Sequence, residues 1–270
     1  MTKKKSKKKI SKKQKSMKEG FTQAKEAQKK ENPKKDDPAQ KSEQSKVMDS
    51  TELENQKLAA EKTAAIASYI KDPDYRLRCK AAIDILMAKL KMINAELSGQ
   101  KKRTVISQIT SRIKSAESIY AKLLKKGLEP DFETARKNLK DLICIRVVCP
   151  FEDELYQVAE FLEMQKDIEI VRIKDYIRNP KPSGYTSYHM IVSTPINMGD
   201  RKVDTVVEIQ IRTVAMDFWA SLEHKIQYKF EGEGNTPVYI SNDLRDCARI
   251  VADLDARMLA LNQAIQEIEA

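Results

Sequence analysis

The hydrophobic residues of this chain recur with two different periods. Over residues 51–97 and 244–268 the apolar side chains return at steps of three and four residues, which predicts long helices. In the first region, one helix is expected to begin near Pro73 and to end at Gly99. The second region has a regular 3-4-3-4-3-4-3 spacing, made by Leu244, Cys247, Val251, Leu254, Met258, Leu261, Ile265 and Ile268. Such a seam suits packing against another helix, in this chain or in a second copy.

Between these regions, segments with strand and helix patterns follow one another. Runs rich in β-branched residues predict strands at residues 105–114, 142–149, 168–173, 188–194 and 207–213. Helical spacing predicts helices at residues 116–126, 131–140, 153–164 and 214–230, with Ser115 as an N-cap and Gly127 as a stop. The order predicts an α/β (α+β) fold, a sheet flanked by helices, with helical extensions at both ends.

The strand at residues 207–213 alternates strictly between apolar and polar side chains. Val207, Ile209 and Ile211 face one way, and the opposite face carries Glu208, Gln210 and Arg212. A strand that is buried on one face and presents an acid, an amide and a guanidinium on the other lines a polar site. We expect that site to bind a nucleotide.

A turn rich in Gly, Pro and Ser, residues 181–187, leads into the strand before it. This turn presents Lys181 and an exposed Tyr185, and His189 follows in the strand. Tyr185 is suited to stack on a base, although exposed loop tyrosines are common and mostly inert. His189 fits either a ligand contact or a strand histidine whose hydrogen bonds are satisfied within the fold.

Cations surround a second candidate site. Arg112 and Lys114 share a strand face, while Ser118 and Lys122 share a face of the helix that follows. A strand that leads into a helix start is suited to hold a polyphosphate, although charged residues beside a helix are usually solvated. Arg146 interrupts an apolar strand and therefore needs an anion or a stacking partner, either an ion pair or a ligand.

Two carboxylates, Asp141 and Glu208, stand at strand ends and predict a Mg²⁺ site. Mg²⁺ favours few carboxylates together with phosphate oxygens and water. Lys174 and Lys181 add to the cations already named, and acids within a ring of cations are what phosphoryl transfer requires. The chain has no G-x-x-x-x-G-K-[ST] sequence and is therefore not a P-loop protein.

The basic charge of the chain is confined to its first residues. Residues 1–46 contain 17 lysines and six acidic residues, a net charge of +11, whereas the whole chain carries +10. Large apolar side chains are almost absent there, so we predict disorder. This tail either contacts RNA, ribosomes or anionic membranes through its charge, or is a solvated tail without a specific role.

Several classes of protein are excluded by composition. No apolar run reaches the roughly 18 residues of a membrane span, and the lysine-rich start lacks the apolar stretch of a secretory signal, so a cytoplasmic protein is expected. The chain has two histidines and no C-x-x-C pair, which disfavours a zinc site. We expect buried, reduced thiols at Cys79, Cys144, Cys149 and Cys247.

Together these segments resemble the RelA/SpoT-type (p)ppGpp synthetase domain, and specifically the small alarmone synthetases. The resemblance runs in order from about residue 111 to 229 and rests on these blocks: Arg112-Ile-Lys-Ser with Ser118 and Lys122; Asp141 with Ile145-Arg146; Lys174-Asp175-Tyr176-Ile177; Lys181-x-Ser-Gly-Tyr185-x-Ser-x-His189; Glu208-Ile-Gln-Ile-Arg-Thr213; and Phe218-Trp-Ala-Ser-x-Glu-His224 with Tyr228-Lys229. It implies a nucleotidyltransferase-like mixed sheet and transfer of pyrophosphate from ATP to the 3′-hydroxyl of GDP or GTP, which yields AMP and ppGpp or pppGpp.

The resemblance also implies roles for single residues. Arg112 and Arg146 would flank adenine, with Lys114, Ser118 and Lys122 on the ATP phosphates. Asp141 and Glu208 would hold Mg²⁺, and Glu208 would be the base. Tyr185 would stack on guanine, while the acceptor nucleotide would be positioned by Lys174, Lys181, His189 and Gln210. Three positions depart from the family pattern: Ile143, Cys144 and Thr186. We expect repacking without loss of activity at the first two, and no phosphate contact is carried over to Thr186.

The family further implies a homotetramer formed through flanking helices, which would give the seam at 244–268 a role. A hydrolase domain is not expected, because both histidines fall within the synthetase blocks. We divide the chain into a disordered tail (1–50), an N-terminal helical segment (51–100), a catalytic domain (101–232) and a C-terminal helix (233–270). The alternative is a catalytically inert relative that binds nucleotide or RNA.

Overall fold

The computed structural model describes residues 38–228 and 236–269. The chain divides into two compact units, residues 1–57 and 58–270. Of the first unit, the described part belongs to α2 (Pro38–Lys71). Residues 38–50 are thus helical where we predict disorder, and residues 1–37 of the predicted tail lie outside the described part. The physical reason is that α2 consists of good helix formers and has no Gly or Pro after its first position. The prediction of disorder considered only how few apolar side chains this segment can bury.

The helix α3 (Pro73–Lys101) forms the base of the core. Asp72 accepts a hydrogen bond from the backbone N–H of Tyr75 at 2.9 Å and Pro73 takes the first helical position, so the predicted start is confirmed. The helix does not end at Gly99, however. It continues to Lys101 and stops where Lys102 adopts the left-handed conformation. A glycine within a helix costs only about 1 kcal/mol, which the buried stripe of α3 outweighs.

The second unit is built on one mixed sheet with the strand order β1-β2-β5-β4-β3. The strands are β1 (Gln108–Ile113), β2 (Ile143–Cys149), β3 (Glu169–Asp175), β4 (Tyr188–Met198) and β5 (Arg201–Thr213). Only β2 and β5 are parallel; the other neighbours are antiparallel. The predicted fold class, a mixed sheet flanked by helices, is confirmed.

The strands β4 and β5 form a hairpin that is longer than predicted. They pair from Tyr188–Ile211 to Met198–Arg201, across a turn in which Gly199 has a φ of +62°. We predict strands only at 188–194 and 207–213, because the tip carries exposed polar residues that conceal the strand pattern. Cross-strand hydrogen bonds, which do not depend on the polarity of side chains, extend both strands.

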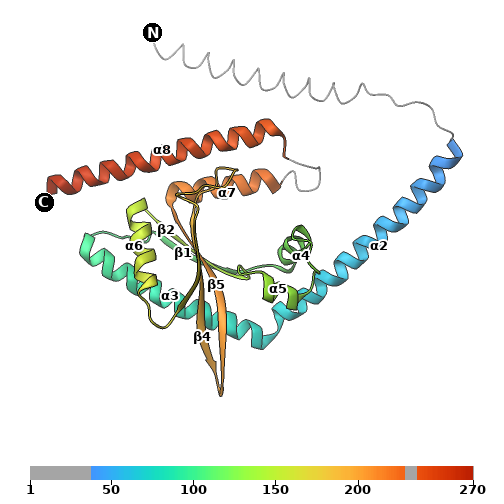
Figure 1. Cartoon of the computed structure of the whole chain (residues 1–270), viewed down its shortest axis with the longest axis horizontal. Coiled ribbons are helices and arrows are strands. Elements are labelled where there is room, and N and C mark those ends of the chain that lie inside the picture. The colour runs from blue at the N-terminus through green and yellow to red at the C-terminus, as the bar shows by residue number, and fades with distance from the viewer. Residues whose placement is uncertain (1–37, 229–235, 270) are drawn as a thin grey trace, which may run out of the picture. The chain divides into compact units, whose positions relative to one another are not determined.

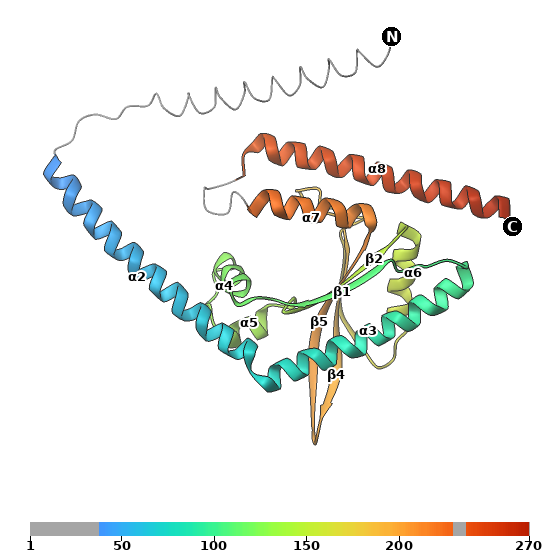
Figure 2. The same cartoon turned by 180° about the vertical axis from the view of Figure 1, so that it is seen from behind.

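Helices pack against both faces of the sheet (Figures 1 and 2). The remaining helices are α4 (Ala116–Lys125), α5 (Phe132–Asn138), α6 (Glu152–Glu163), α7 (Val214–Tyr228) and α8 (Val238–Glu269). In both views α3 and α6 lie together beside the sheet, and α8 runs along α7. The apolar face of β5 is fully buried in the core, with Val207, Ile209 and Ile211 at 0% exposure. The polar face of β5 is therefore left free to line a site.

Two further expectations are settled by burial and helix geometry. All four cysteines are free thiols, and three are buried, but Cys247 is exposed because it lies on the outer surface of α8. Helical spacing alone could not tell which apolar positions of α8 face the rest of the chain. Among the described residues, no helix has the length and apolar character needed to cross a membrane.

Candidate active site

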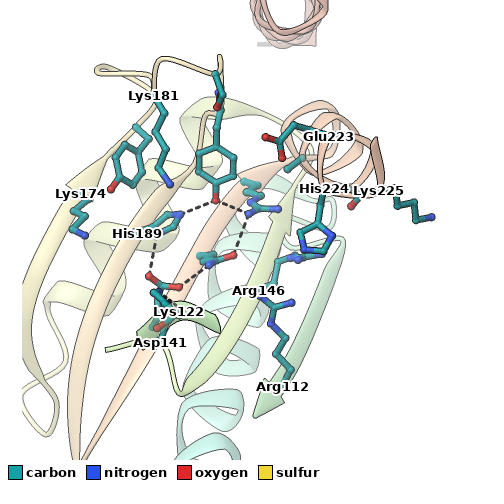
Figure 3. A pocket seen from close by; sticks show the side chains of 18 residues that line it. Arg112, Lys122, Asp141, Arg146, Lys174, Lys181, His189, Glu223, His224 and Lys225 are labelled. Atoms are coloured by element: carbon teal, nitrogen blue, oxygen red, sulfur yellow. Dashed lines mark hydrogen bonds and ion pairs between the residues drawn. The ribbon is translucent and has the colours of Figure 1, made fainter. Parts of the chain in front are cut away.

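A cavity of about 550 Å³ opens on the polar face of the sheet (Figure 3). It takes residues from all five strands of the sheet, from the loops beside them and from α4 and α7. The lining comprises Arg112, Lys122, Asp141, Arg146, Lys174, Tyr176, Lys181, Ser183, Tyr185, His189, Glu208, Gln210, Arg212, Ala220, Ser221, Glu223, His224 and Lys225. Cations outnumber acids in this set, so the cavity is suited to anionic ligands.

Glu208 belongs to a closed ring of hydrogen bonds on the cavity floor. Its Oε1 lies 3.2 Å from His189 Nδ1, and its Oε2 accepts from Gln210 Nε2 at 2.6 Å. Arg212 Nη2 donates to Gln210 Oε1 at 3.1 Å and to Tyr185 Oη at 2.6 Å. Tyr185 Oη in turn lies 2.9 Å from His189 Nε2, which closes the ring. The strand pairing His189–Gln210 brings these side chains together.

The ring determines which nitrogen of His189 carries the proton. Because a guanidinium only donates, Tyr185 Oη accepts a hydrogen bond from Arg212 Nη2, and the Tyr185 hydroxyl donates a hydrogen bond to His189 Nε2. The Nδ1–H of His189 then donates to Glu208 Oε1. Burial lowers the pKa of His189, assisted by Arg212 and Lys181, although Glu208 acts in the opposite direction. A neutral imidazole therefore orients an ionised carboxylate.

The pKa of Glu208 is the balance of opposing effects. Burial raises it, and the charge of Asp141 also raises it, while hydrogen bonds from His189 and Gln210 lower it. The net shift is downward, so Glu208 is ionised at neutral pH. An ionised, firmly oriented carboxylate at the floor of a cationic cavity can accept a proton from a bound hydroxyl.

Asp141 forms a second charged cluster on the same side of the sheet. Its Oδ2 accepts from Lys114 Nζ at 2.9 Å and from Lys122 Nζ at 2.6 Å. Burial raises the pKa of Asp141, but the two lysines outweigh burial and lower it to about 2. Its other oxygen, Oδ1, is buried and has no hydrogen-bond partner among the described residues.

Arg146 forms an ion pair with Asp217, which provides the anionic partner that the sequence predicts for this arginine. Its Nη1 lies 3.2 Å from Asp217 Oδ1, and the same oxygen accepts from Arg212 Nη1 at 3.0 Å. The pairing of β1 with β2 sets Arg112 opposite Cys144 and Thr110 opposite Arg146, so the two arginines are diagonal neighbours (Figure 3). Arg146 thus has an ion pair and also lines the cavity.

Tyr185 is half-buried rather than exposed, which corrects the prediction for this side chain. Its hydroxyl is held in the ring, and Lys181 Nζ lies 4.5 Å from the centroid of its aromatic ring. The same ammonium lies 4.7 Å from the centroid of Tyr176. The loop therefore forms a small aromatic and cationic wall of the cavity, which a turn-type sequence pattern cannot reveal.

The structure brings together most of the predicted site residues. Only two of them lie outside the cavity lining: Lys114, which donates a hydrogen bond to Asp141, and Ser118, an exposed residue in the first turn of α4. The lining residues that we do not assign from sequence lie mainly on α7 and in the loops: Tyr176, Ser183, Ala220, Ser221, Glu223, His224 and Lys225. Helical spacing places Ser221, His224 and Lys225 on one side of α7, but only packing shows that this side meets the cavity.

Comparison with known proteins adds independent evidence. Residues 111–233 match the family described as a region found in RelA / SpoT proteins. GTP pyrophosphokinase YwaC of Bacillus subtilis (strain 168) is 39% identical over 186 residues, which span 69% of this chain and 88% of that protein. The chain belongs to the RelA/SpoT family. GTP pyrophosphokinase YjbM of the same organism is 34% identical over 192 residues, covering 71% of this chain and 88% of that protein.

Solved structures place the chain among the small alarmone synthetases of the RelA/SpoT family. Small alarmone synthetase 2 from Bacillus subtilis matches with a TM-score of 0.62 at 39% identity, covering 70% of this chain and 96% of that one. Small alarmone synthetase 1 from the same organism, bound to its product pppGpp, matches with a TM-score of 0.64 at 31% identity. That match covers 72% of this chain and 100% of the other.

The site residues fit the divalent metal ion that this family generally needs. Asp141 and Glu208 line the same cavity, and the buried Oδ1 of Asp141 has no hydrogen-bond partner among the described residues. Among the described residues, no group of three or more His, Cys, Asp or Glu side chains is arranged to hold a metal. A site with two carboxylates, completed by phosphate oxygens and water, is the arrangement that Mg²⁺ favours over a cage of protein ligands.

Proposed function

We propose that this protein transfers the β,γ-pyrophosphate of ATP to the 3′-hydroxyl of GDP or GTP, which yields ppGpp or pppGpp and AMP. The observation that carries the proposal is the pair Asp141 and Glu208: two ionised carboxylates that line one cation-rich cavity on the same side of the sheet. The matches to proteins named GTP pyrophosphokinase support the same activity.

ATP is assigned to the part of the cavity beside β1 and α4. Arg112 and Arg146 are diagonal neighbours with planar guanidinium groups, which suits them to flank adenine. Lys114 and Lys122 already converge on an anionic oxygen and provide charge for the phosphates. Ser118, in the first turn of α4, would donate to a phosphate only if the polyphosphate extends beyond the cavity lining.

GDP or GTP is assigned to the side of the cavity beside β4 and α7. Tyr185 is suited to stack on guanine, and phosphates of the acceptor would meet the positive and hydrogen-bonding groups nearby: Lys174, Lys181, His189 and Gln210. Glu223 lines the same side, and burial raises its pKa. A carboxylate there would accept hydrogen bonds from the donor groups on the edge of guanine, which adenine does not offer in the same arrangement.

The chemistry follows from these positions. The 3′-oxygen attacks the β-phosphorus of ATP, the bond from that phosphorus to the oxygen bridging to the α-phosphorus breaks, and AMP leaves with that oxygen. The hydroxyl proton passes to Glu208, which the imidazole of His189 keeps oriented. Mg²⁺, held by Asp141 and Glu208, would supply charge neutralisation for the phosphates. Holding two nucleotides in line can lower the barrier by roughly 7–11 kcal/mol.

The decisive experiment is a product assay. Pure protein is incubated with ATP, Mg²⁺ and either GDP or GTP, and AMP and the 3′-pyrophosphorylated nucleotide are quantified by anion-exchange chromatography. We expect the two products in equal amounts. Binding of both nucleotides without any AMP would instead support an inert, nucleotide-binding relative and contradict the proposed activity.

An oligomer is proposed through α8. Its predicted seam is only partly used within the chain: Leu244 is buried, but five apolar residues are exposed, namely Leu254, Met258, Leu261, Ile265 and Ile268. An apolar stripe of this kind suits packing against the same helix of a second copy, in the proposed tetramer. Leu261→Glu should lower the molar mass measured by light scattering, whereas Gln263→Glu, an exposed position on the opposite face of α8, should not. An unchanged mass for Leu261→Glu would rule out this interface.

The remaining assignments concern organisation and location. We propose a catalytic domain at residues 101–232 that is preceded by the helical segment 51–100 and followed by the C-terminal helix 233–270. The lysine-rich tail, residues 1–46, is proposed to contact RNA or ribosomes non-specifically through its charge. Deletion of residues 1–46 should abolish salt-sensitive RNA binding and leave turnover intact. The proposed location is the cytoplasm, where ATP and GTP are available.

A further inference from the structure

The loop that carries Lys181 and Tyr185 rests against α8. We call residues 181–185 the acceptor loop. Within the loop, Gly184 N donates to Lys181 O at 2.8 Å and Lys181 N donates to Tyr185 O at 3.1 Å, which forms a tight turn. These backbone bonds shape the loop, and the Tyr185 hydroxyl joins its end to β4 and β5 through His189 and Arg212. The backbone of residues 182–184 is held by contacts on the opposite side, from α8.

The first contact behind the loop is a hydrogen bond from α8. Arg245 Nε donates to the backbone carbonyl of Pro182 at 3.0 Å. A hollow of about 210 Å³ lies beside this hydrogen bond, lined by Pro182, Ser183, Ser241, Leu244 and Arg245. The Arg245 guanidinium therefore connects α8 to the loop at a place where their side chains are not closely packed.

The second contact is a close approach of two backbones. Gly184 has a φ of +90°, and a Cβ built on it would lie 2.6 Å from the Cβ of Ala248. Only glycine fits at this position of the loop, and only a small residue fits opposite it on α8. Tyr185 and Ala248 also pack against the buried cluster of Trp219 and Leu244. Trp219 Nε1 donates to Leu244 O at 3.0 Å, which attaches α7 to α8 at the same point.

We propose that α8 holds the acceptor loop in its binding position, with Arg245 and Ala248 as positioning residues for the guanosine nucleotide. This inference rests on the proposed function, because it takes the loop to bind the acceptor. Neither residue lines the cavity, so each acts through Lys181 and Tyr185 and not by touching the nucleotide. Among the described residues, no hydrogen bond or ion pair joins this part of α8 to β1 or α4, which form the ATP side of the cavity.

Steady-state kinetics with two pairs of variants tests the proposal. Arg245→Ala removes the hydrogen bond and should raise the KM for GDP about threefold to tenfold, the range expected for one partly solvated hydrogen bond. Ala248→Leu places a larger side chain at the point where Gly184 approaches α8, and should raise the KM for GDP at least about tenfold. The matched controls are Arg249→Ala, an exposed arginine paired with Asp246 one turn away, and Ala252→Leu on an exposed position of the same helix.

The KM for ATP should stay within about twofold in every variant, and Arg245→Lys should recover part of the loss because lysine can still donate to the Pro182 carbonyl. Equal rises in both KM values, or an unchanged KM for GDP in both Arg245→Ala and Ala248→Leu, would overturn the proposal. Melting temperatures near that of the wild type exclude a general loss of folding.

Direct binding separates failure of this inference from failure of the proposed function. Trp219 is the only tryptophan of the chain and lies beneath the acceptor loop, so its fluorescence reports GDP binding without turnover. If the wild type makes no product, the proposed function fails. Weaker GDP binding by Arg245→Ala and Ala248→Leu would even then agree with the proposed role of α8 in positioning the loop. If the wild type is active and all variants bind GDP equally, only the inference about α8 fails.

Discussion

His189 Nδ1 lies 3.2 Å from Glu208 Oε1, on adjacent antiparallel strands. The hydrogen bonds of this strand histidine are thereby satisfied within the fold, and its side chain also lines the cavity, while its contact with a nucleotide stays a prediction. Its Nε2 is engaged by Tyr185, so the imidazole cannot turn away from Glu208 without breaking two hydrogen bonds. The proposed base is consequently held in place by its neighbours before any nucleotide binds.

Replacing Glu208 by glutamine should remove the proposed base while preserving the shape of the site. We expect turnover to fall by about 10²-fold to 10⁴-fold, the usual contribution of a general base. GDP binding, followed by Trp219 fluorescence, should change little. Glu160→Gln on the exposed surface of α6 is the control. Retained turnover in Glu208→Gln would mean that another group accepts the proton.

Two substitutions of Tyr185 separate its two contacts. Tyr185→Phe keeps an aromatic ring for guanine but removes the hydroxyl that bridges Arg212 and His189. We expect it to lower kcat about fivefold to tenfold with a nearly unchanged KM for GDP. Tyr185→Leu removes the aromatic face, and because stacking on a base is worth about 1–3 kcal/mol, its KM for GDP should rise at least about fivefold. Identical kinetics for the two variants would refute separate roles.

Asp141 should set the magnesium requirement. Asp141→Asn removes the buried charge that Lys114 and Lys122 neutralise, and leaves a weaker ligand where the free Oδ1 stands. We expect the Mg²⁺ concentration for half-maximal rate to rise at least about tenfold, and chelation with EDTA to stop turnover in every variant. The measurement is a Mg²⁺ titration at fixed nucleotide. Asp167→Asn, which disrupts an exposed pair with Lys89, should leave the titration unchanged.

The pH dependence follows from the directions of the pKa shifts. Burial lowers the pKa of His189 below 6.5. Hydrogen bonds from His189 and Gln210 lower the pKa of Glu208 below 4.5, because they outweigh the opposite effect of burial. Between pH 6.5 and 8, His189 therefore stays neutral and Glu208 stays ionised, so kcat should begin to fall only below pH 6.5. A limb above pH 6.5 that disappears in His189→Gln would contradict this expectation.

Stability should fall with acid for the same reasons. The unfolded chain protonates His189 near pH 6.5, whereas the folded protein resists, so the melting temperature should begin to decline below that pH. Asp141 contributes at lower pH: its stabilisation is complete above its unfolded pKa of 3.8 and is lost as the pH falls through about 2. In Asp141→Asn the second decline should be smaller, as melting curves between about pH 2 and 7 would reveal.

Local pattern predicted most of the architecture because it depends on short-range periodicity. The alternation of β5 correctly divides Val207, Ile209 and Ile211 from Glu208 and its neighbours, since the period of a strand is two whatever surrounds it. The ends of helices and strands were less predictable. Gly99 lies within α3, and the hairpin beyond Pro195 extends through polar residues, because packing and strand pairing override local preference at these points.

The amino-acid sequence by itself determined the mixed sheet and its helices, the polar face of β5 and the charged residues available to a nucleotide site. Only the tertiary structure decided that Tyr185, His189 and Glu208 share one ring of hydrogen bonds, that Glu223 on α7 lines the cavity and that α8 contacts the loop at residues 181–185. The physical reason is the separation of the interacting residues along the chain. Local periodicity assigns a side chain to one face of a helix or strand, whereas contacts between distant residues depend on strand register and on the packing of whole helices.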